Sequence, residues 1–293
     1  MIIPVILGPT CIGKTSLALE IARETGADIL SIDSRQVFKY LDIATGKYKD
    51  DLEVLKSDGY WVIDNIKIWG YDILNPSDEL NVLKYCEFAK KIIEEYRDSN
   101  KKLLATCGTG FYLDFLSGKV KFKEIDEARK KELNLKNIEE LRLILKNLNF
   151  NQNIDLNNNL RLITKILDLE SSSVESNFQI DGISFKTFYL NSSREMLYKN
   201  ADTFSEEILK KGAIEEFSEN YKKFGEFKSL KGLIYKEIFE YINTGLSLTE
   251  LSSKIKFSLH AYIRRQQTYF KKMQIEFSSN DRKEIAVKIK EIL

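Results

Sequence analysis

The sequence predicts an α/β fold in which a doubly wound parallel sheet carries a small inserted helical domain. Three observations lead to this prediction. An apolar run, a glycine-rich loop and an amphipathic run follow one another at the start of the chain. Apolar and amphipathic runs then alternate as far as Gly118, and residues 119–147 beyond it are rich in Lys, Glu and Leu at helical spacing. Repeated strand–helix units imply parallel strands joined by crossover helices.

The first strand, loop and helix form one continuous pattern. Ile2–Leu7 is an apolar run typical of a buried strand, and after the loop Leu17 and Ile21 stand four residues apart on one helical face. Between them lies a complete G-x-x-x-x-G-K-[ST] match, the P-loop pattern, whose residues are Gly8, Pro9, Thr10, Cys11, Ile12, Gly13, Lys14 and Thr15.

The P-loop pattern brings several phosphate-binding groups to one point. Glycines let backbone N–H groups converge on an anion, and a helix N-terminus contributes about half a positive charge. Lys14 can reach a terminal phosphate, and the Thr15 hydroxyl can bind Mg²⁺. Because strand and helix flank the loop correctly, a chance glycine turn is disfavoured, and the sequence predicts a site for a di- or triphosphate.

Two further predicted strands end in polar turns. The run Asp28–Ile32 precedes Asp33, Ser34, Arg35 and Gln36, and the run 103–106 precedes a turn at 107–110. Helices are predicted at 81–97 and 111–116. Ligands of doubly wound sheets gather at the carboxyl ends of the strands. We therefore expect the glycine loop, residues 33–36 and the 107–110 turn to line one cleft.

Asp33 has two interpretations at this stage. A carboxylate at the end of a strand can cap the helix that follows. Facing a phosphate loop, it can instead hold Mg²⁺ through water or accept a proton from an incoming nucleophile. No strand with four apolar residues and a terminal Asp follows, and Thr106 to Thr109 occupy that place, which is unusual for an ATPase.

The second half of the chain predicts helices. Residues 119–147 have helical spacing, 149–159 hold six asparagines and predict a loop, and 160–169 predict another helix. From 193 to 293 the pattern is mostly helical, with a capping-box spacing at Ser247 and Glu250. We expect a core of residues 1–118 and 186–293 and a helical insert at 119–185.

Composition narrows the class of protein. The chain has 293 residues, of which 43% are hydrophobic and 30% charged, as in globular proteins. No apolar run approaches the roughly 20 residues that span a bilayer, and the first residues predict no signal peptide. Three scattered cysteines fit a reducing compartment, and the single histidine, His260, excludes a histidine-rich metal site. We expect a cytoplasmic monomer without membrane contact.

The net charge of +1 says nothing about partners, but one segment is strongly basic. Residues 254–274 hold six Lys or Arg residues and no acid, with four aromatic residues between them. Basic charge interleaved with aromatic rings is typical of nucleic-acid binding. A solvated helical face gives the same pattern, so both interpretations stay open on this evidence.

Five segments together resemble the tRNA dimethylallyltransferase family, also called tRNA isopentenyltransferases. Its members attach a five-carbon prenyl group to an adenosine beside the anticodon. The resemblance follows family order and covers about residues 2–272. It rests on the P-loop, on Asp33-Ser34-Arg35-Gln36-Val37-Phe38 with Leu41 to Lys47, on 72–76, on Cys107 to Tyr112, and on Tyr262-Ile263-Arg264-Arg265-Gln266-Gln267-Thr268-Tyr269.

The resemblance implies a role for each matching residue. Dimethylallyl diphosphate would lie against the amides of residues 10–15 and Lys14, with Mg²⁺ on Thr15. Asp33 would accept the proton of adenine N6 at tRNA position 37, giving N6-isopentenyladenosine. The anticodon stem-loop of tRNA would contact Asp33, Ser34, Arg35, Gln36, Thr109, Arg129, Leu160, Arg161, Leu162, Ile163, Thr164, Arg264 and Arg265.

The sequence also departs from the family. Asn200 and Phe204 stand where arginines are common, and Ile68-Trp69 stands where paired histidines are usual. The rival interpretation is a P-loop small-molecule kinase that uses ATP. It predicts ATP turnover without tRNA and no need for the basic segment. A third interpretation, an RNA-binding GTPase-like switch, is disfavoured because no N-K-x-D motif occurs.

Overall fold

The protein has an α/β fold, as predicted. The computed structural model describes residues 1–293 except 48–52, 123–125, 151–153, 172–175, 227–228 and 230–231. The chain divides into two compact units, one of residues 1–117 with 180–293 and one of residues 118–179. The predicted boundary at 186 differs from this division, because a strand of the larger unit begins before it.

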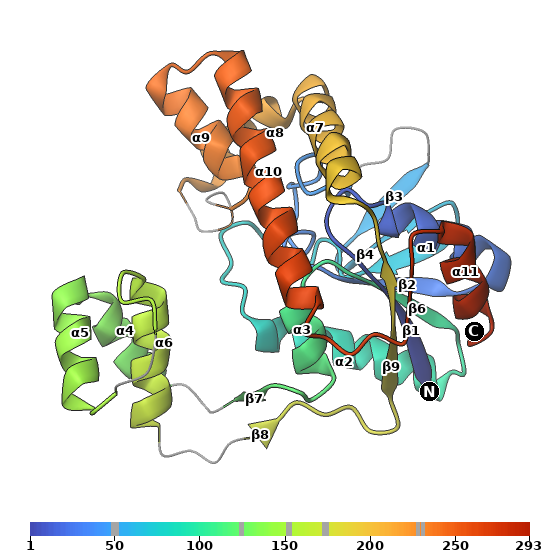
Figure 1. Cartoon of the computed structure of the whole chain (residues 1–293), viewed down its shortest axis with the longest axis horizontal. Coiled ribbons are helices and arrows are strands. Elements are labelled where there is room, and N and C mark those ends of the chain that lie inside the picture. The colour runs from blue at the N-terminus through green and yellow to red at the C-terminus, as the bar shows by residue number, and fades with distance from the viewer. Residues whose placement is uncertain (48–52, 123–125, 151–153, 172–175, 227–228, 230–231) are drawn as a thin grey trace. The chain divides into compact units, whose positions relative to one another are not determined.

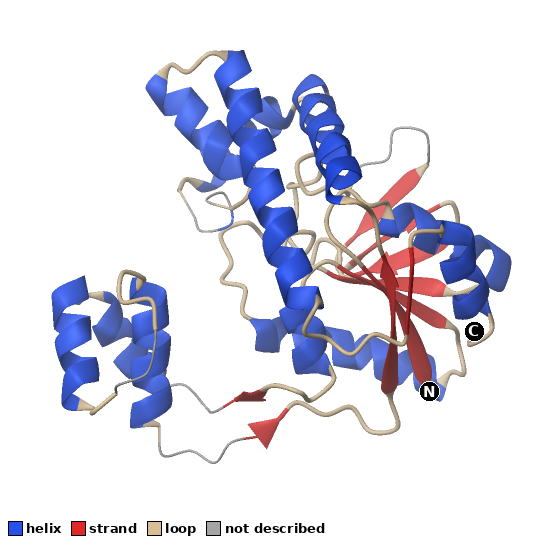
Figure 2. Cartoon of the chain, viewed as in Figure 1, coloured by secondary structure: helices blue, strands red, loops and turns tan. Residues whose placement is uncertain are grey.

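A mostly parallel sheet forms the centre of the larger unit (Figure 2). Among the described residues its strand order is β10-β9-β1-β6-β2-β5-β4-β3. The three strands predicted from the sequence are confirmed at its centre. They are β1 (Ile2–Leu7), β2 (Asp28–Ile32) and β6 (Leu103–Cys107), and β6 pairs in parallel with both of the others.

The sheet is not parallel throughout, which corrects the prediction. One edge is a meander of β3 (Val54–Ser57), β4 (Tyr60–Ile63) and β5 (Ile66–Trp69), in which successive strands are antiparallel. Two-residue turns join them, with positive φ at Gly59 in the first and at Asp64 and Asn65 in the second. Such turns match the twist of an antiparallel hairpin.

The other edge is formed by two strands that the sequence analysis missed. β9 (Ser184–Leu190) pairs with the whole length of β1, and the short β10 (Phe277–Ser279) pairs with β9. Both pairings are parallel. They bring β9 and β10 to the same sheet as the first strand. Residues of α1 (Lys14–Thr25), from the start of the chain, and of α7 (Arg194–Lys210) and α10 (Leu248–Phe270), from its end, therefore line the same cavity.

Helices cover both faces of the sheet (Figure 1). α1 (Lys14–Thr25) and α11 (Arg282–Lys290) lie on one side, where Leu17 and Ile21 pack with Ile285 and Ile289 in a core cluster. On the other side lie α3 (Gly110–Leu116) and α10 (Leu248–Phe270), and α2 (Val82–Asp98) packs against α3. The predicted helices at 81–97 and 111–116 are thereby confirmed.

The C-terminal part of the larger unit is helical, as predicted. It comprises α7 (Arg194–Lys210), α8 (Ala213–Phe224), α9 (Tyr235–Thr244) and α10. The capping box at the start of α10 is present, with Ser247 accepting from the Glu250 N–H and the Glu250 carboxylate accepting in return. α7 and α10 pack together, and the rings of Tyr198 and His260 stack between them at 3.9 Å.

The smaller unit has its own core. Its elements are β7 (Lys121–Phe122), α4 (Glu127–Asn134), α5 (Ile138–Asn147), α6 (Asn159–Glu170) and β8 (Ser176–Asn177). Leu133, Leu141, Leu145, Leu162 and Ile166 pack together inside it. Part of the predicted asparagine-rich loop, 151–153, lies outside the described residues. Among the helices that the structure describes, none is long and apolar enough to cross a membrane.

Candidate active site

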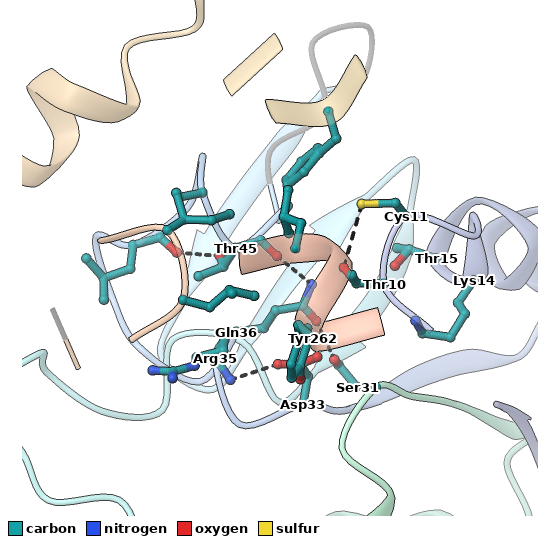
Figure 3. A pocket seen from close by; sticks show the side chains of 18 of the residues that line it. Thr10, Cys11, Lys14, Thr15, Ser31, Asp33, Arg35, Gln36, Thr45 and Tyr262 are labelled. Carbon is teal, nitrogen blue, oxygen red and sulfur yellow. Dashed lines mark hydrogen bonds between the residues drawn. The ribbon is translucent and has the colours of Figure 1, made fainter. Parts of the chain in front are cut away.

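A cavity of about 400 Å³ opens at the carboxyl ends of β1, β2 and β6 in the larger unit. Lys14, Thr15, Asp33 and Gly108 line it together with residues of α7 and α10. The expected meeting of the glycine loop, the residues after β2 and the turn after β6 is therefore confirmed. Figure 3 shows side chains of the glycine loop and of the segment after β2 around this cavity, among them Thr10, Lys14, Asp33 and Gln36.

The glycine loop wraps the N-terminus of α1 at the floor of this cavity. Cys11 and Gly13 both have positive φ, 61° and 90°, whereas Ile12 between them does not. Such alternation of left- and right-handed backbone conformations is typical of anion-binding nests. The Lys14 ammonium donates to the Pro9 carbonyl at 2.9 Å. Burial lowers the pKa of Lys14 and the Asp33 carboxylate partly offsets this, so an anion beside the amine would favour its charged form.

Cys11 and Thr10 complete the loop. The Thr10 hydroxyl and the Cys11 thiol lie 3.8 Å apart, and burial raises the pKa of the thiol to about 11, so it stays protonated at neutral pH. The Thr10 N–H is already engaged, because it donates to the Gln266 side chain at 2.8 Å. The P-loop pattern did not predict this contact.

Asp33 stands at the mouth of β2 and points into the cavity (Figure 3). One carboxylate oxygen accepts from the Arg35 N–H at 2.7 Å, which closes a local turn. The residues that follow form turns and no helix, so the helix-cap interpretation does not fit. The other oxygen touches Gly108, where an added Cβ would come within 2.5 Å of it.

Thr109 and Tyr262 lie next to Asp33. The Ser34 N–H donates to the Thr109 hydroxyl at 3.1 Å, which joins the turn after β2 to the turn after β6. Burial raises the pKa of the Tyr262 phenol, and the nearby Asp33 carboxylate raises it further. The Arg265 guanidinium lies 5.7 Å from the centroid of the Tyr262 ring. The cavity thus has an aromatic wall beside its carboxylate.

Gln36 connects β2 to the segment 41–47. Its side chain accepts from the Ser31 hydroxyl at 2.6 Å and donates to the Thr45 carbonyl at 3.2 Å. The half-buried Glu216 carboxylate of α8 accepts from the N–H groups of Asp42 and Ile43 at 2.7 and 2.9 Å. Burial raises the pKa of Glu216. Together these contacts hold Thr45 and Gly46 against the cavity.

A buried ion-pair network anchors the same segment. The Lys47 side chain is inaccessible to solvent, and its ammonium lies 2.7 Å from Asp42, 2.5 Å from Asp72 and 2.7 Å from the Phe38 carbonyl. Asp72 also accepts from the Trp61 indole N–H at 2.7 Å. A buried charge is tolerated only when partners surround it in this way.

Replacing Lys47 with methionine is expected to destabilise the protein by about 3–5 kcal/mol, because the Asp72 carboxylate would stay buried without its cation and Asp42 would keep only the exposed Lys56. The matched control is Lys56→Met. Lys56 also pairs with Asp42, at 2.6 Å, but its side chain is 49% exposed, and such pairs contribute at most about 1 kcal/mol. Urea unfolding of both variants measures the difference. Equal losses of unfolding free energy would contradict the assignment of Lys47 as a buried anchor.

One wall of the cavity is apolar and belongs partly to α7. Phe38, Leu41, Phe204 and Leu233 line it. Asn200 and Phe204, which stand where the family commonly has arginines, both face the cavity. The Asn200 side chain donates to the Cys11 carbonyl at 3.1 Å, and the Phe204 ring lies against Gly46. These two positions therefore contribute packing and a loop contact rather than positive charge.

The predicted tRNA-contact residues fall into three groups. Asp33, Ser34, Arg35, Gln36 and Thr109 meet in or beside the cavity. Arg264 and Arg265 are exposed on α10, where a shallow hollow also includes Thr268, Tyr269 and Lys272. Arg129 and 160–164 belong to the smaller unit.

In the smaller unit the predicted residues differ in exposure. Leu160, Arg161 and Thr164 are exposed, whereas the side chains of Leu162 and Ile163 pack inside the unit's core. Arg129 forms a two-pronged contact with Glu170, at 2.8 and 2.7 Å, and also pairs with Glu132. Any ligand of Arg129 must compete with these two carboxylates.

The oxygen atoms in the cavity suit a magnesium ion. The Thr15 and Ser31 hydroxyls and the Asp33 carboxylate all line it, and hard oxygen ligands are what Mg²⁺ prefers. Across the described part of the chain, no cluster of three or more His, Cys, Asp or Glu residues has the arrangement of a metal site. A site with few protein ligands is typical of Mg²⁺ bound jointly with substrate phosphates.

Two site residues were missed by the sequence analysis. In the sequence, Gln266 stands within the segment Tyr262–Tyr269 without an individual role, and no pattern indicates Glu216. Both act on segments more than 150 residues away in the chain. No local pattern reports such a contact. The one available signal was that α10 places Tyr262 and Gln266 four residues apart on a single face.

Comparison with known families gives a match over most of the chain. Residues 36–273 match the family model described as IPP transferase. Among curated proteins, the tRNA dimethylallyltransferase of Clostridioides difficile is 30% identical, over 92% of this chain and 89% of its own length. The enzyme of the same name from Lactococcus lactis is 30% identical, over 93% and 90%.

Solved structures with the same fold were also found. The full-length tRNA isopentenylpyrophosphate transferase of Bacillus halodurans superimposes with a TM-score of 0.70 at 21% identity, covering 99% of this chain and 94% of that one. A eukaryotic dimethylallyltransferase acting on tRNA superimposes with a TM-score of 0.71 at 17% identity, covering 96% and 74%. At these identities the likeness concerns the fold.

Proposed function

Because this chain belongs to the IPP transferase family, we infer that it transfers a dimethylallyl group from dimethylallyl diphosphate to tRNA. The acceptor is N6 of the adenosine at position 37, beside the anticodon, and the product is N6-isopentenyladenosine. One observation supports placing this reaction in the cavity: Lys14 of the glycine loop and the Asp33 carboxylate both line it.

The glycine loop is proposed to act as a P-loop that binds the leaving group. When an allylic diphosphate departs, negative charge builds on its oxygens. The positive end of α1 and the Lys14 ammonium stabilise that charge, because both are already in place and need no reorganisation. The apolar wall of Phe38, Leu41 and Phe204 offers a dry surface for the five-carbon chain and keeps water from the reacting carbon.

Asp33 is proposed to be the general base. An exocyclic adenine amine is a weak nucleophile while it keeps its proton, and it becomes reachable only when the base leaves the stack. The Asp33 oxygen beside Gly108 accepts that proton as N6 attacks the prenyl carbon. Tyr262 provides an aromatic face next to this carboxylate on which an extruded base can stack.

The Thr15 hydroxyl is proposed to help hold Mg²⁺ when the diphosphate is bound. The ion would neutralise charge on the leaving oxygens. The Thr15 hydroxyl supplies one ligand from the first turn of α1, and the buried Tyr71 phenol lies beside it. The hydroxyl thus presents a hard oxygen at the helix terminus where the phosphate oxygens gather.

The tRNA is proposed to contact residues in both units. In the larger unit these are the residues around Asp33 and the exposed arginines of α10. In the smaller unit, which we propose is an insert that contacts the anticodon arm, the candidates are the half-buried Arg129 and the exposed Leu160, Arg161 and Thr164. The buried side chains of Leu162 and Ile163 support this surface from behind. The monomeric state and the cytoplasmic location stay predictions.

The acceptor atom is tested with two anticodon stem-loops that differ at one base. One carries adenosine at position 37 and the other inosine, which lacks the N6 amine. The proposal predicts transfer of label from dimethylallyl diphosphate to the first RNA and none to the second. Equal labelling of both RNAs would contradict N6 as the acceptor. The kinase alternative is not favoured, since residues 36–273 match the IPP transferase family.

Reversing the charges of Arg264 and Arg265 is expected to weaken tRNA binding and lower its salt dependence by about one slope unit per lost phosphate contact. Both side chains are exposed, and the neighbouring Lys272 adds to the same positive surface. The affinity for dimethylallyl diphosphate should change little. Titration of tRNA binding at several salt concentrations measures the slope.

Lys288→Glu is the matched control for this reversal. Lys288 is a half-exposed lysine on α11, across the sheet from α10 (Figure 1). Its reversal should leave the salt slope unchanged. If the reversals at Arg264 and Arg265 also left the salt dependence of tRNA binding unchanged, this face of α10 would be a solvated surface that does not contact RNA.

A further inference from the structure

One face of α10 contacts the two loops that carry the proposed reaction. Along this face lie Leu259 and Tyr262, which line the cavity, then Gln266, then Tyr269. Tyr269 packs against Gly110, and its hydroxyl donates to Asp114 at 2.7 Å. Arg264 and Arg265 point to a different, exposed face. The helix therefore contacts the site with buried residues, Leu259 and Gln266, and with the half-buried Tyr262 and Tyr269.

Gln266 is the residue that joins the two loops. Its side chain is buried, with 6% of the residue exposed. The side-chain oxygen accepts from the Thr10 N–H at 2.8 Å, and the side-chain nitrogen donates to the Gly108 carbonyl at 2.8 Å. The two partners fix the orientation of the amide, since one can only donate and the other can only accept.

These two hydrogen bonds connect Gln266 to the proposed diphosphate site and to the loop that contacts the proposed base, Asp33. Thr10 belongs to the glycine loop that would hold the diphosphate. Gly108 packs against Asp33 so closely that an added Cβ would come within 2.5 Å of the carboxylate oxygen and 3.9 Å of the Gln266 nitrogen. A shift of the Gly108 backbone would therefore displace the Asp33 carboxylate. One amide group thus connects the leaving-group site to the base.

We propose that Gln266 is a positioning residue for prenyl transfer, which holds the glycine loop and Asp33 at a fixed separation. This inference rests on the proposed function. The reacting carbon is bound through its diphosphate on one side and attacked by an amine held at Asp33 on the other. In-line attack depends on that separation, and a misplacement of about 1 Å can reduce a rate about 100-fold.

The first variant is Gln266→Leu, which keeps the size of the side chain and removes both bonds. The single-turnover rate of transfer to an anticodon stem-loop, with both substrates saturating, is expected to fall about 10–100-fold. RNA affinity should stay within about twofold, because Gln266 is buried and makes no exposed surface. A loss confined to the chemical step is what positioning predicts.

The second variant, Gln266→Glu, distinguishes positioning from general destabilisation. Its carboxylate can accept from Thr10 but cannot donate to Gly108, whereas the protonated carboxyl can do both. The rate of the variant divided by the wild-type rate should therefore rise as the pH falls. Burial and the Asp33 carboxylate favour protonation of the new carboxyl, and Lys14 opposes it. Cys107 and Tyr262, also close by, have raised pKa values and stay neutral.

Gln267→Leu is the matched control. Gln267 is the next residue along α10, and its side-chain oxygen has no hydrogen-bond partner among the described residues. The Gln267→Leu variant should retain the wild-type rate of single-turnover transfer. Wild-type transfer is measured first, and its absence would refute the proposed function rather than this inference.

With wild-type transfer present, two results would overturn the positioning role. One is a Gln266→Leu protein that is folded and transfers at the wild-type rate. The other is a rate ratio for Gln266→Glu that does not change with pH. If Gln266→Leu does not fold, the rate ratio of the second variant alone decides.

Discussion

Replacing Asp33 with asparagine is expected to slow single-turnover prenyl transfer about 10²–10⁴-fold, the range that general-base catalysis usually contributes. Asparagine keeps the side-chain oxygen that accepts from the Arg35 N–H, so the local turn stays intact. It removes the group that takes the proton from N6. Because Asp33 would act on the chemical step, tRNA affinity should be nearly unchanged. Rapid-quench measurement with enzyme in excess gives the rate directly.

Asp281→Asn is the matched control for this substitution. Asp281 accepts from the N–H two residues later, at 2.8 Å, as Asp33 does, but it caps α11 instead of facing the cavity. Asparagine caps a helix well, so this variant should retain both stability and rate. If Asp33→Asn folds, binds tRNA and also transfers near the wild-type rate, Asp33 is structural and the proposed mechanism fails.

Replacing Lys14 with alanine is expected to weaken binding of dimethylallyl diphosphate by about 1.5–3 kcal/mol, roughly 10–150-fold. The ammonium donates to the Pro9 carbonyl in this structure and is positioned at the start of α1, where phosphate oxygens gather. Its contact with the diphosphate is charge-assisted, and such contacts are the stronger class of hydrogen bond. tRNA affinity should not change. Donor titration under single-turnover conditions measures the effect.

Lys186→Ala is the control for the loss of one lysine. Lys186 lies on β9 with 39% of its side chain exposed and pairs with Glu276 at 3.6 Å, which is a weak surface contact. Its loss should leave donor affinity unchanged. A Lys14→Ala protein with wild-type donor affinity and rate would show that the glycine loop does not hold the diphosphate.

The centre of the fold could be predicted because its signals are local. β1, the glycine loop and α1 are consecutive, so their apolar spacing and glycine positions identify them without any long-range information. The edge strands were missed for two different reasons. Asp58-Gly59 and Asp64-Asn65 are residue pairs typical of hairpin turns, so the antiparallel edge does carry a local signal in the sequence. β9 pairs with a strand 182 residues earlier in the chain, Ile2 lying opposite Ser184, and no neighbouring motif indicates it.

The site was predictable to the same extent. Four of the predicted residues follow strand ends: Lys14, Thr15, Asp33 and Thr109. Because ligands of parallel sheets bind at the carboxyl ends of the strands, the sequence correctly predicts that these residues lie close together. The residues that hold those loops in place come from elsewhere. The Lys47 network depends on Asp72 and Trp61 from the antiparallel edge, and Gln266 reaches Thr10 across 256 residues. Such contacts follow from the packing of the whole unit, which residue spacing does not encode.

The measurement that tests the central claim most directly uses the wild-type protein and two donors. The protein is incubated with labelled dimethylallyl diphosphate and unmodified tRNA, and in parallel with labelled ATP without tRNA, each in the presence of Mg²⁺. The tRNA is then digested to nucleosides. Our account predicts that the label appears in N6-isopentenyladenosine and that ATP is not turned over. Unlabelled tRNA together with ATP turnover would contradict it and would favour a kinase that uses the same loop.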